Sequence, residues 1–186
     1  MPSFFLALLA CFVASAGARD QRLVAALSAR LGAGNALLAA SWMASAITAC
    51  IAAVAGAAVG SLLPPAGKAM FVAFALLAAA VELALPIRQR DLDEPTRSVF
   101  AVVLVLIARQ IGDGARFLIA AIAAATGVPV LAALGGAIGA GAALTLGWGL
   151  GGALTARLPL RPIRSGIAGI LLFAALWTGL SARGII

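Results

Sequence analysis

The strongest constraint in this sequence is a series of six apolar segments with short polar intervals between them. They cover approximately residues 3–17, 33–60, 66–86, 99–112, 128–154 and 163–182. An α-helix needs about 20 apolar residues to cross a bilayer, and lipid cannot satisfy a backbone polar group that the helix leaves free. The pattern therefore predicts an all-α membrane protein with six transmembrane helices. Its expected partner is the lipid bilayer.

Composition excludes several other classes of protein. Of the 186 residues, 64% are hydrophobic and 10% charged, which is too little charge for the surface of a soluble domain. His is absent and both cysteines lie in apolar segments, and the sequence contains no nucleophile–base pair and no cofactor motif. We therefore expect that the protein is not an enzyme. The net charge of +7 comes from dispersed arginines without aromatic clusters, which argues against nucleic-acid binding.

The basic residues also predict an orientation in the membrane. The first, third and fifth loops would carry nine of the 13 Lys and Arg residues: Arg19, Arg22, Arg30, Arg88, Arg90, Arg97, Arg157, Arg161 and Arg164. Loops rich in Lys and Arg stay in the cytoplasm, so we expect a multi-pass protein of the cell inner membrane with both termini outside the cytoplasm. Residues 3–17 resemble a secretory signal but lack its positive n-region, so we interpret them as a retained helix.

The chain divides into two similar halves. A polar interval separates a first three-helix repeat (1–86) from a second (99–186), with a central polar loop at 87–98. A shift of 95 positions aligns the two halves without a gap, and its most telling matches are Gly17 with Gly112, Gly32 with Gly127, and Pro64 with Pro159. Because three crossings are an odd number, the two repeats would be inverted, a common plan of secondary transporters with a midplane site.

The first helix of each half is expected to break. A continuous helix over 3–31 would be about 44 Å long, against a hydrocarbon core of about 30 Å. Gly17 and Gly112 are the natural positions for a helix break in the two halves. Elsewhere, the pairs Gly56 with Gly60 and Gly135 with Gly139 predict helices that approach each other closely.

Acidic residues are scarce, which narrows the search for a functional site. Asp91, Asp93 and Glu94 fall in the central loop and are expected to be solvated. Asp20, Glu82 and Asp113 lie instead in or beside apolar segments. An ionisable group at such a depth is a functional candidate unless another charge neutralises it.

Asp113 lies in the sequence Gln-Ile-Gly-Asp-Gly-Ala-Arg (110–116), and the repeat aligns this with Ser-Ala-Gly-Ala-Arg-Asp-Gln (15–21). Here the chain resembles the Gdt-type cation/proton exchangers, a family that includes Golgi manganese and calcium transporters and bacterial manganese exporters. That family has two three-helix halves, each with an E-φ-G-D-[KR]-[ST] signature. In the second half Gln110, Gly112 and Asp113 fall on the E, G and D places; in the first half Ser15, Gly17 and Ala18 do so, with Asp20 two positions later.

The resemblance implies a secondary transporter that exports a divalent cation, Mn²⁺ or Ca²⁺, in exchange for protons. The implied metal ligands are Asp113, Gln110, Ser15 and Asp20. Asp113 would also accept the proton, and Glu82 is a candidate for the proton or ion path. The cation is cargo, and no bound cofactor is expected. The family pattern brings four carboxylates together, whereas this chain keeps Asp113 in place and offers Asp20 as a substitute.

Three arginines are expected charge partners that favour other interpretations. Arg109 lies four residues before Asp113 and Arg116 three after it, on one face of a continuous helix, while Arg19 precedes Asp20. Neutralised carboxylates would fit a non-transporting homologue that serves as a membrane scaffold or subunit. A surplus of arginine would fit a transporter of a different, anionic substrate. The oligomeric state is left open.

Overall fold

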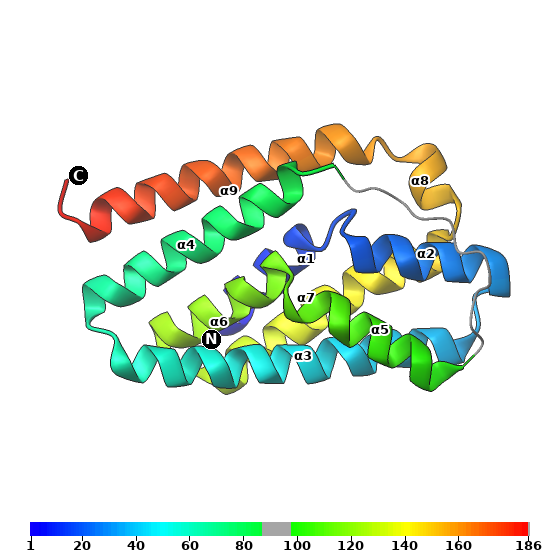
Figure 1. Cartoon of the computed structure of the whole chain (residues 1–186), viewed down its shortest axis with the longest axis horizontal. Helices are drawn as coiled ribbons and strands as arrows, with labels where there is room; N and C mark the ends of the chain where they lie inside the picture. Colours follow the sequence, from blue (N-terminus) through cyan, green and yellow to red (C-terminus); the bar gives the residue numbers. More distant parts are fainter. Residues whose placement is uncertain (87–97, 186) are drawn as a thin grey trace.

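The structure is a computed structural model that describes residues 1–86 and 98–185, and in these ranges every regular element is an α-helix (Figure 1). The first half contains α1 (Pro2–Ala14), α2 (Arg19–Leu31), α3 (Asn35–Leu62) and α4 (Pro65–Ala84). The second contains α5 (Val99–Ile111), α6 (Gly114–Thr126), α7 (Pro129–Leu150), α8 (Ala153–Arg157) and α9 (Leu160–Ala182). The all-α prediction is confirmed.

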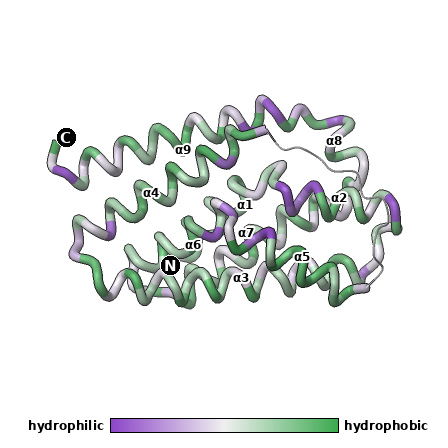
Figure 2. The backbone as a smooth tube through the Cα atoms, in the orientation of Figure 1, coloured by the Kyte–Doolittle hydropathy of each residue, from purple (hydrophilic) through white to green (hydrophobic). Residues whose placement is uncertain are grey.

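In the part of the chain that the structure describes, four helices are long and apolar enough to cross a membrane: α3, α4, α7 and α9. A fifth span results if α1 and α2 count as one segment bent by 63°. Figure 2 shows α3, α4 and α9 as largely hydrophobic, whereas hydrophilic residues gather at the start of α2 and around α8. The first apolar segment of each half forms a helix of 13 residues, about 20 Å long, which is shorter than the hydrocarbon core.

Two predicted segments differ from the helices that form. The segment 128–154 is divided, because α7 ends at Leu150 and Gly151 adopts a φ of +50°, a conformation that favours glycine. The last segment starts at Leu160, earlier than expected, since Pro162 lies in the first helical turn, where no backbone donor is needed. Of the predicted central loop, 87–97 lie outside the described residues, and Ser98 caps α5 through the amide of Ala101.

The two halves pack against each other in a reciprocal way. The first helix of each half contacts the long helix of the other half, so that α1 packs on α7 and α5 packs on α3, while α4 pairs with α9 (Figure 1). Glycines allow the closest approaches. A Cβ atom at Gly135 or Gly139 would overlap backbone carbonyls of α1, and one at Gly56 or Gly60 would overlap the backbone of α6. The predicted small-residue contacts are therefore confirmed at these pairs.

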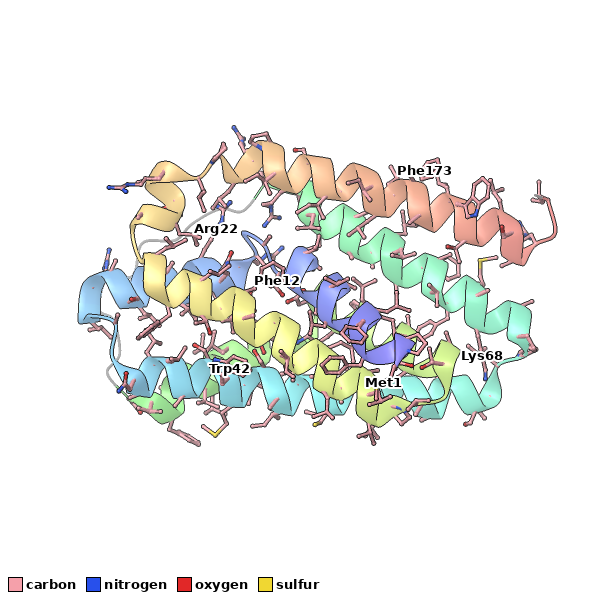
Figure 3. All side chains as sticks on the ribbon, turned by 180° about the vertical axis from the view of Figure 1, so that it is seen from behind. Met1, Phe12, Arg22, Trp42, Lys68 and Phe173 are labelled. Atoms are coloured by element: carbon pink, nitrogen blue, oxygen red, sulfur yellow. The ribbon has the colours of Figure 1, made fainter. Side chains whose placement is uncertain are left out.

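Large apolar side chains face outwards, as they do in a protein surrounded by lipid. Phe173 of α9 is 68% exposed and points away from the bundle (Figure 3). The interior instead contains mainly alanine, glycine and serine, together with several buried polar residues. This inside-out distribution makes the buried polar residues conspicuous, because the helices do not need them for close packing.

Candidate functional site

The site is built around two helix breaks, one in each half of the chain. The first separates α1 from α2, and Phe12 and Arg22 lie on its two sides (Figure 3). Gly17 lies in this break with a φ of +67°. The second break separates α5 from α6, with Gly112 and Asp113 between them. Each short second helix therefore begins inside the bundle, with its N-terminus beside a carboxylate.

Side chains satisfy the backbone that the first break sets free. The Gly17 amide donates to Gln21 Oε1 at 2.6 Å. Its carbonyl oxygen accepts from Arg22 Nε at 3.0 Å and from Arg164 Nη1 at 2.6 Å. Lipid offers no such partners, so a break at this point is possible only where polar side chains surround it.

The second break is stabilised by two carboxylates. Asp113 is the N-cap of α6, and its Oδ1 accepts from the Ala115 amide at 2.8 Å. Glu82, near the end of α4, accepts from the Gly114 amide. Negative charge at a helix N-terminus is favourable, because the first backbone N–H groups of the helix are unpaired.

Gln110, the last buried residue of α5, connects the two breaks. Its Nε2 donates to Asp20 Oδ2 at 3.1 Å, so the end of α5 is joined to the start of α2. Its Oε1 accepts from Arg116 Nη2 at 2.6 Å, and the Thr48 hydroxyl lies 2.9 Å from the same oxygen. We call these residues the Gln110 cluster: Asp20, Thr48, Gln110, Asp113 and Arg116. All five are at most 5% exposed.

Arg116 supplies the positive charge of this cluster. Its Nε donates to Thr48 Oγ1 at 3.0 Å, and its Nη1 lies 3.6 Å from Asp113 Oδ2. Within the described residues, Nη1 makes no hydrogen bond, and the buried hydroxyls of Ser15 and Ser45 also lack a partner. Unsatisfied buried polar groups are rare, so these three are groups that a rearrangement or a small ligand could pair.

The structure brings together some of the residues that the sequence grouped and places the others outside the cluster. Asp20, Gln110 and Asp113 belong to the cluster, Ser15 is buried at the end of α1, and Glu82 holds the second break from α4. Arg19 and Arg109 are exposed, and Arg109 donates to the Arg19 carbonyl at 3.5 Å rather than to Asp113. The expected Arg109–Asp113 pairing assumes a continuous helix, but the chain breaks at Gly112 and the i,i+4 relation ends there.

Three important residues are not singled out by the sequence. Thr48 lies in a stretch of α3 where the two repeats share no identity, and Gln21 is distinguished only as part of a motif. The sequence pattern places Arg164 among the loop charges, yet it is buried and donates to four backbone carbonyls, those of Gly17, Glu82, Leu83 and Leu85. The sequence feature that could have identified Arg164 is its position inside an apolar segment, two residues after Pro162.

An open cleft of about 780 Å³ reaches the second break. It lies beside α4, where Phe74 and Val81 line its apolar wall, and Glu82, Gly112 and Gly114 line the end next to the break. The cleft therefore extends to the residues immediately on either side of Asp113. Glu82 both lines this opening and bonds to the backbone at the start of α6.

The cluster offers few free ligands for a cation in the described conformation. Among residues 1–86 and 98–185, no group of three or more His, Cys, Asp and Glu side chains could hold a metal ion. The Gln110 amide oxygen already accepts from Arg116, with the Thr48 hydroxyl beside it. A cation could bind here only after one of these contacts opens.

In the described residues, fold and site together define an all-helical protein with four or five helices long and apolar enough to span a membrane, and with a buried polar cluster between two helix breaks. No family model, no curated protein and no solved structure matched this chain in three comparisons.

Proposed function

We propose that this chain is a secondary transporter of the inner membrane that exports a divalent cation, Mn²⁺ or Ca²⁺, in exchange for protons. One observation carries the proposal: Gln110 Nε2 and Asp20 Oδ2 form a buried hydrogen bond between the two halves, at the breaks of both. Broken helices that meet at a buried polar site are a feature of transporters with inverted repeats.

The proposed architecture has six crossings in two inverted repeats of three, with both termini outside the cytoplasm. The broken pairs α1–α2 and α5–α6 would each make one crossing, and α3, α4, α7 and α9 would make the others. The reciprocal packing of α1 on α7 and α5 on α3 supports this arrangement. So do Gly32 and Gly127, which end α2 and α6 with φ values of +87° and +67°.

In the proposed mechanism, Asp20 and Asp113 alternate between binding the cation and binding protons. Carboxylate, amide and hydroxyl oxygens are the ligands that hard divalent cations prefer, and the Gln110 cluster contains all three kinds. The cleft beside α4 would lead from one side of the membrane to Glu82 and Asp113. Relative movement of the two halves would then open the cluster to the other side.

One observation favours a second candidate, a non-transporting membrane scaffold or subunit. Arg116 pairs with Asp113 and bonds to Gln110, so one carboxylate and the amide oxygen of the cluster already have partners. In such a homologue the cluster would only stabilise the contact between the two halves.

Cation flux into proteoliposomes distinguishes the two candidates. We expect the purified chain to take up ⁵⁴Mn²⁺ or ⁴⁵Ca²⁺ when a pH gradient is imposed, and Asp113→Asn and Asp20→Asn to reduce uptake by about tenfold or more. The exposed Arg161→Gln serves as a control that retains uptake. Wild-type uptake equal to that of empty liposomes, with correctly folded protein, would exclude the transporter and leave the scaffold.

A further inference from the structure

Arg116 occupies a cage of oxygens contributed by three different elements. Its guanidinium contacts Thr48 Oγ1 of α3, Gln110 Oε1 of α5 and Asp113 Oδ2 at the second break, at 3.0, 2.6 and 3.6 Å. The side chain is 3% exposed. A hydroxyl, an amide and a carboxylate oxygen that converge on one positive charge are also the kind of oxygen ligands that a hard cation takes, with water completing its coordination.

The guanidinium also compensates charge that would otherwise be buried alone. Asp20 and Asp113 are 2% and 5% exposed, and Gln110 links Asp20 to the oxygen that Arg116 contacts. Two carboxylates in such a place need a positive partner, because burial of an unpaired charge is strongly unfavourable. In the described conformation this partner is a side chain of the protein itself.

We propose that Arg116 is a tethered cation that competes with the transported cation for these three oxygens and sets the affinity of the site. The inference rests on the proposed cation transport by the Gln110 cluster. Substrate binds when the guanidinium leaves the cage, and the guanidinium returns when the substrate departs. The site is therefore never left with two unpaired carboxylates, and a cation must outcompete a charge that is always present at high local concentration.

Ser45 is a candidate alternative hydrogen-bond partner for the guanidinium. Ser45 lies three residues before Thr48, about one turn away on the same face of α3, and its buried hydroxyl has no partner in the described part of the chain. Among the same residues, Arg116 Nη1 also lacks a hydrogen bond. Because this donor and this acceptor are both unsatisfied, a hydrogen bond from Arg116 to Ser45 would replace one of the two bonds that the guanidinium gives up when it leaves Thr48 and Gln110.

Equilibrium binding of ⁵⁴Mn²⁺ and ⁴⁵Ca²⁺ to the full chain in detergent tests the competition. Arg116→Gln frees the cage and removes one positive charge, so we expect it to lower the Kd by about tenfold or more. Arg116→Lys keeps a competing charge and should bind within about threefold of wild type.

Arg109→Gln is the matched control for the loss of charge. Arg109 directly precedes Gln110 in the sequence, but its side chain is exposed and donates to the Arg19 carbonyl outside the cage. The substitution therefore removes a nearby positive charge without touching the three oxygens, and solvent screening should limit its effect on the Kd to about threefold. Comparison with Arg116→Gln separates direct competition from a general change in the electrostatic field.

Three results would overturn the inference. The first is an Arg116→Gln protein that binds cation no more tightly than wild type, and the second is an equal gain in Arg109→Gln. The third is an Arg116→Gln protein that fails to fold both with and without added cation, because Arg116 would then be a structural lock. A variant that folds only when cation is present supports the inference, since the cation then replaces the guanidinium.

The same measurements separate this inference from the proposed function. If wild type transports cation while Arg116→Gln binds it no more tightly, the inference alone fails. If Arg116→Gln binds cation more tightly but neither protein moves it across a membrane, the proposed transport alone fails.

Discussion

Gln110 donates from Nε2 to Asp20 Oδ2 at 3.1 Å, a buried hydrogen bond between residues 90 positions apart that joins the end of α5 to the start of α2. The Gln110 amide therefore acts both as a donor and as an acceptor, because its Oε1 accepts from Arg116. A carboxylate at this position could accept from Arg116 but could not donate to Asp20.

Gln110→Glu should destabilise the protein and make its stability depend on cation. Loss of the donor to Asp20 and repulsion between two carboxylates should lower the free energy of unfolding by about 1–3 kcal/mol. Added Mn²⁺ or Ca²⁺ should restore much of it, as thermal unfolding in detergent would measure. Gln21→Glu is the control, since it loses a donor to the Ala143 carbonyl outside the cluster. Equal rescue of both variants by cation would contradict the prediction.

Asp113→Asn and Asp113→Ala should differ in stability although both remove the charge. Asparagine can still cap α6 through the Ala115 amide, whereas alanine cannot, so the alanine variant should be less stable by about 1 kcal/mol. Denaturation of the two variants under one condition measures the difference. Two variants of the same stability would show that the cap contributes nothing.

Arg164→Gln should be strongly destabilising. Arg164 donates to carbonyls of the first break and of the end of α4, and its loss leaves buried acceptors unpaired, at about 3 kcal/mol or more. Arg161→Gln, which changes an exposed arginine one turn earlier on α9, should alter stability by only about 0.5 kcal/mol. The two melting temperatures provide the test, and similar values would argue against a structural role for Arg164.

Gly17→Ala and Gly112→Ala should have unequal effects although the repeat aligns these glycines. Gly17 has a φ of +67°, and a Cβ there would lie 3.3 Å from Arg164 Cδ, so we expect a loss of about 1–2 kcal/mol. Gly112 has a φ of −98° and open space around its Cα, so alanine should change stability by about 0.5 kcal/mol or less. Thermal unfolding compares the two, and an equal loss would contradict the assigned geometry.

Local rules were sufficient to predict the helices, the close helix contacts and the helix breaks. The lengths of the apolar segments predicted helices of the membrane-spanning kind, and α3, α4, α7 and α9 have that character. The glycine pairs predicted close helix contacts, and Gly56 and Gly139 lie against neighbouring backbones. Gly17 and Gly112 lie just after the first helix of each half, as predicted from the excess length of a continuous 3–31 helix and from the alignment of the two repeats.

By itself, the sequence determined that the chain is helical and apolar, and that Asp20 and Asp113 would be difficult to leave unpaired in its interior. Helical spacing assigned both Arg109 and Arg116 to Asp113, and the structure confirms Arg116 as its partner at 3.6 Å. The tertiary structure decided the rest, because the spacing from Arg109 has no meaning across the break at Gly112. Thr48 and Arg164 entered the site from distant helices, because a hydrogen bond depends on where side chains meet in space, and separation along the chain does not specify that.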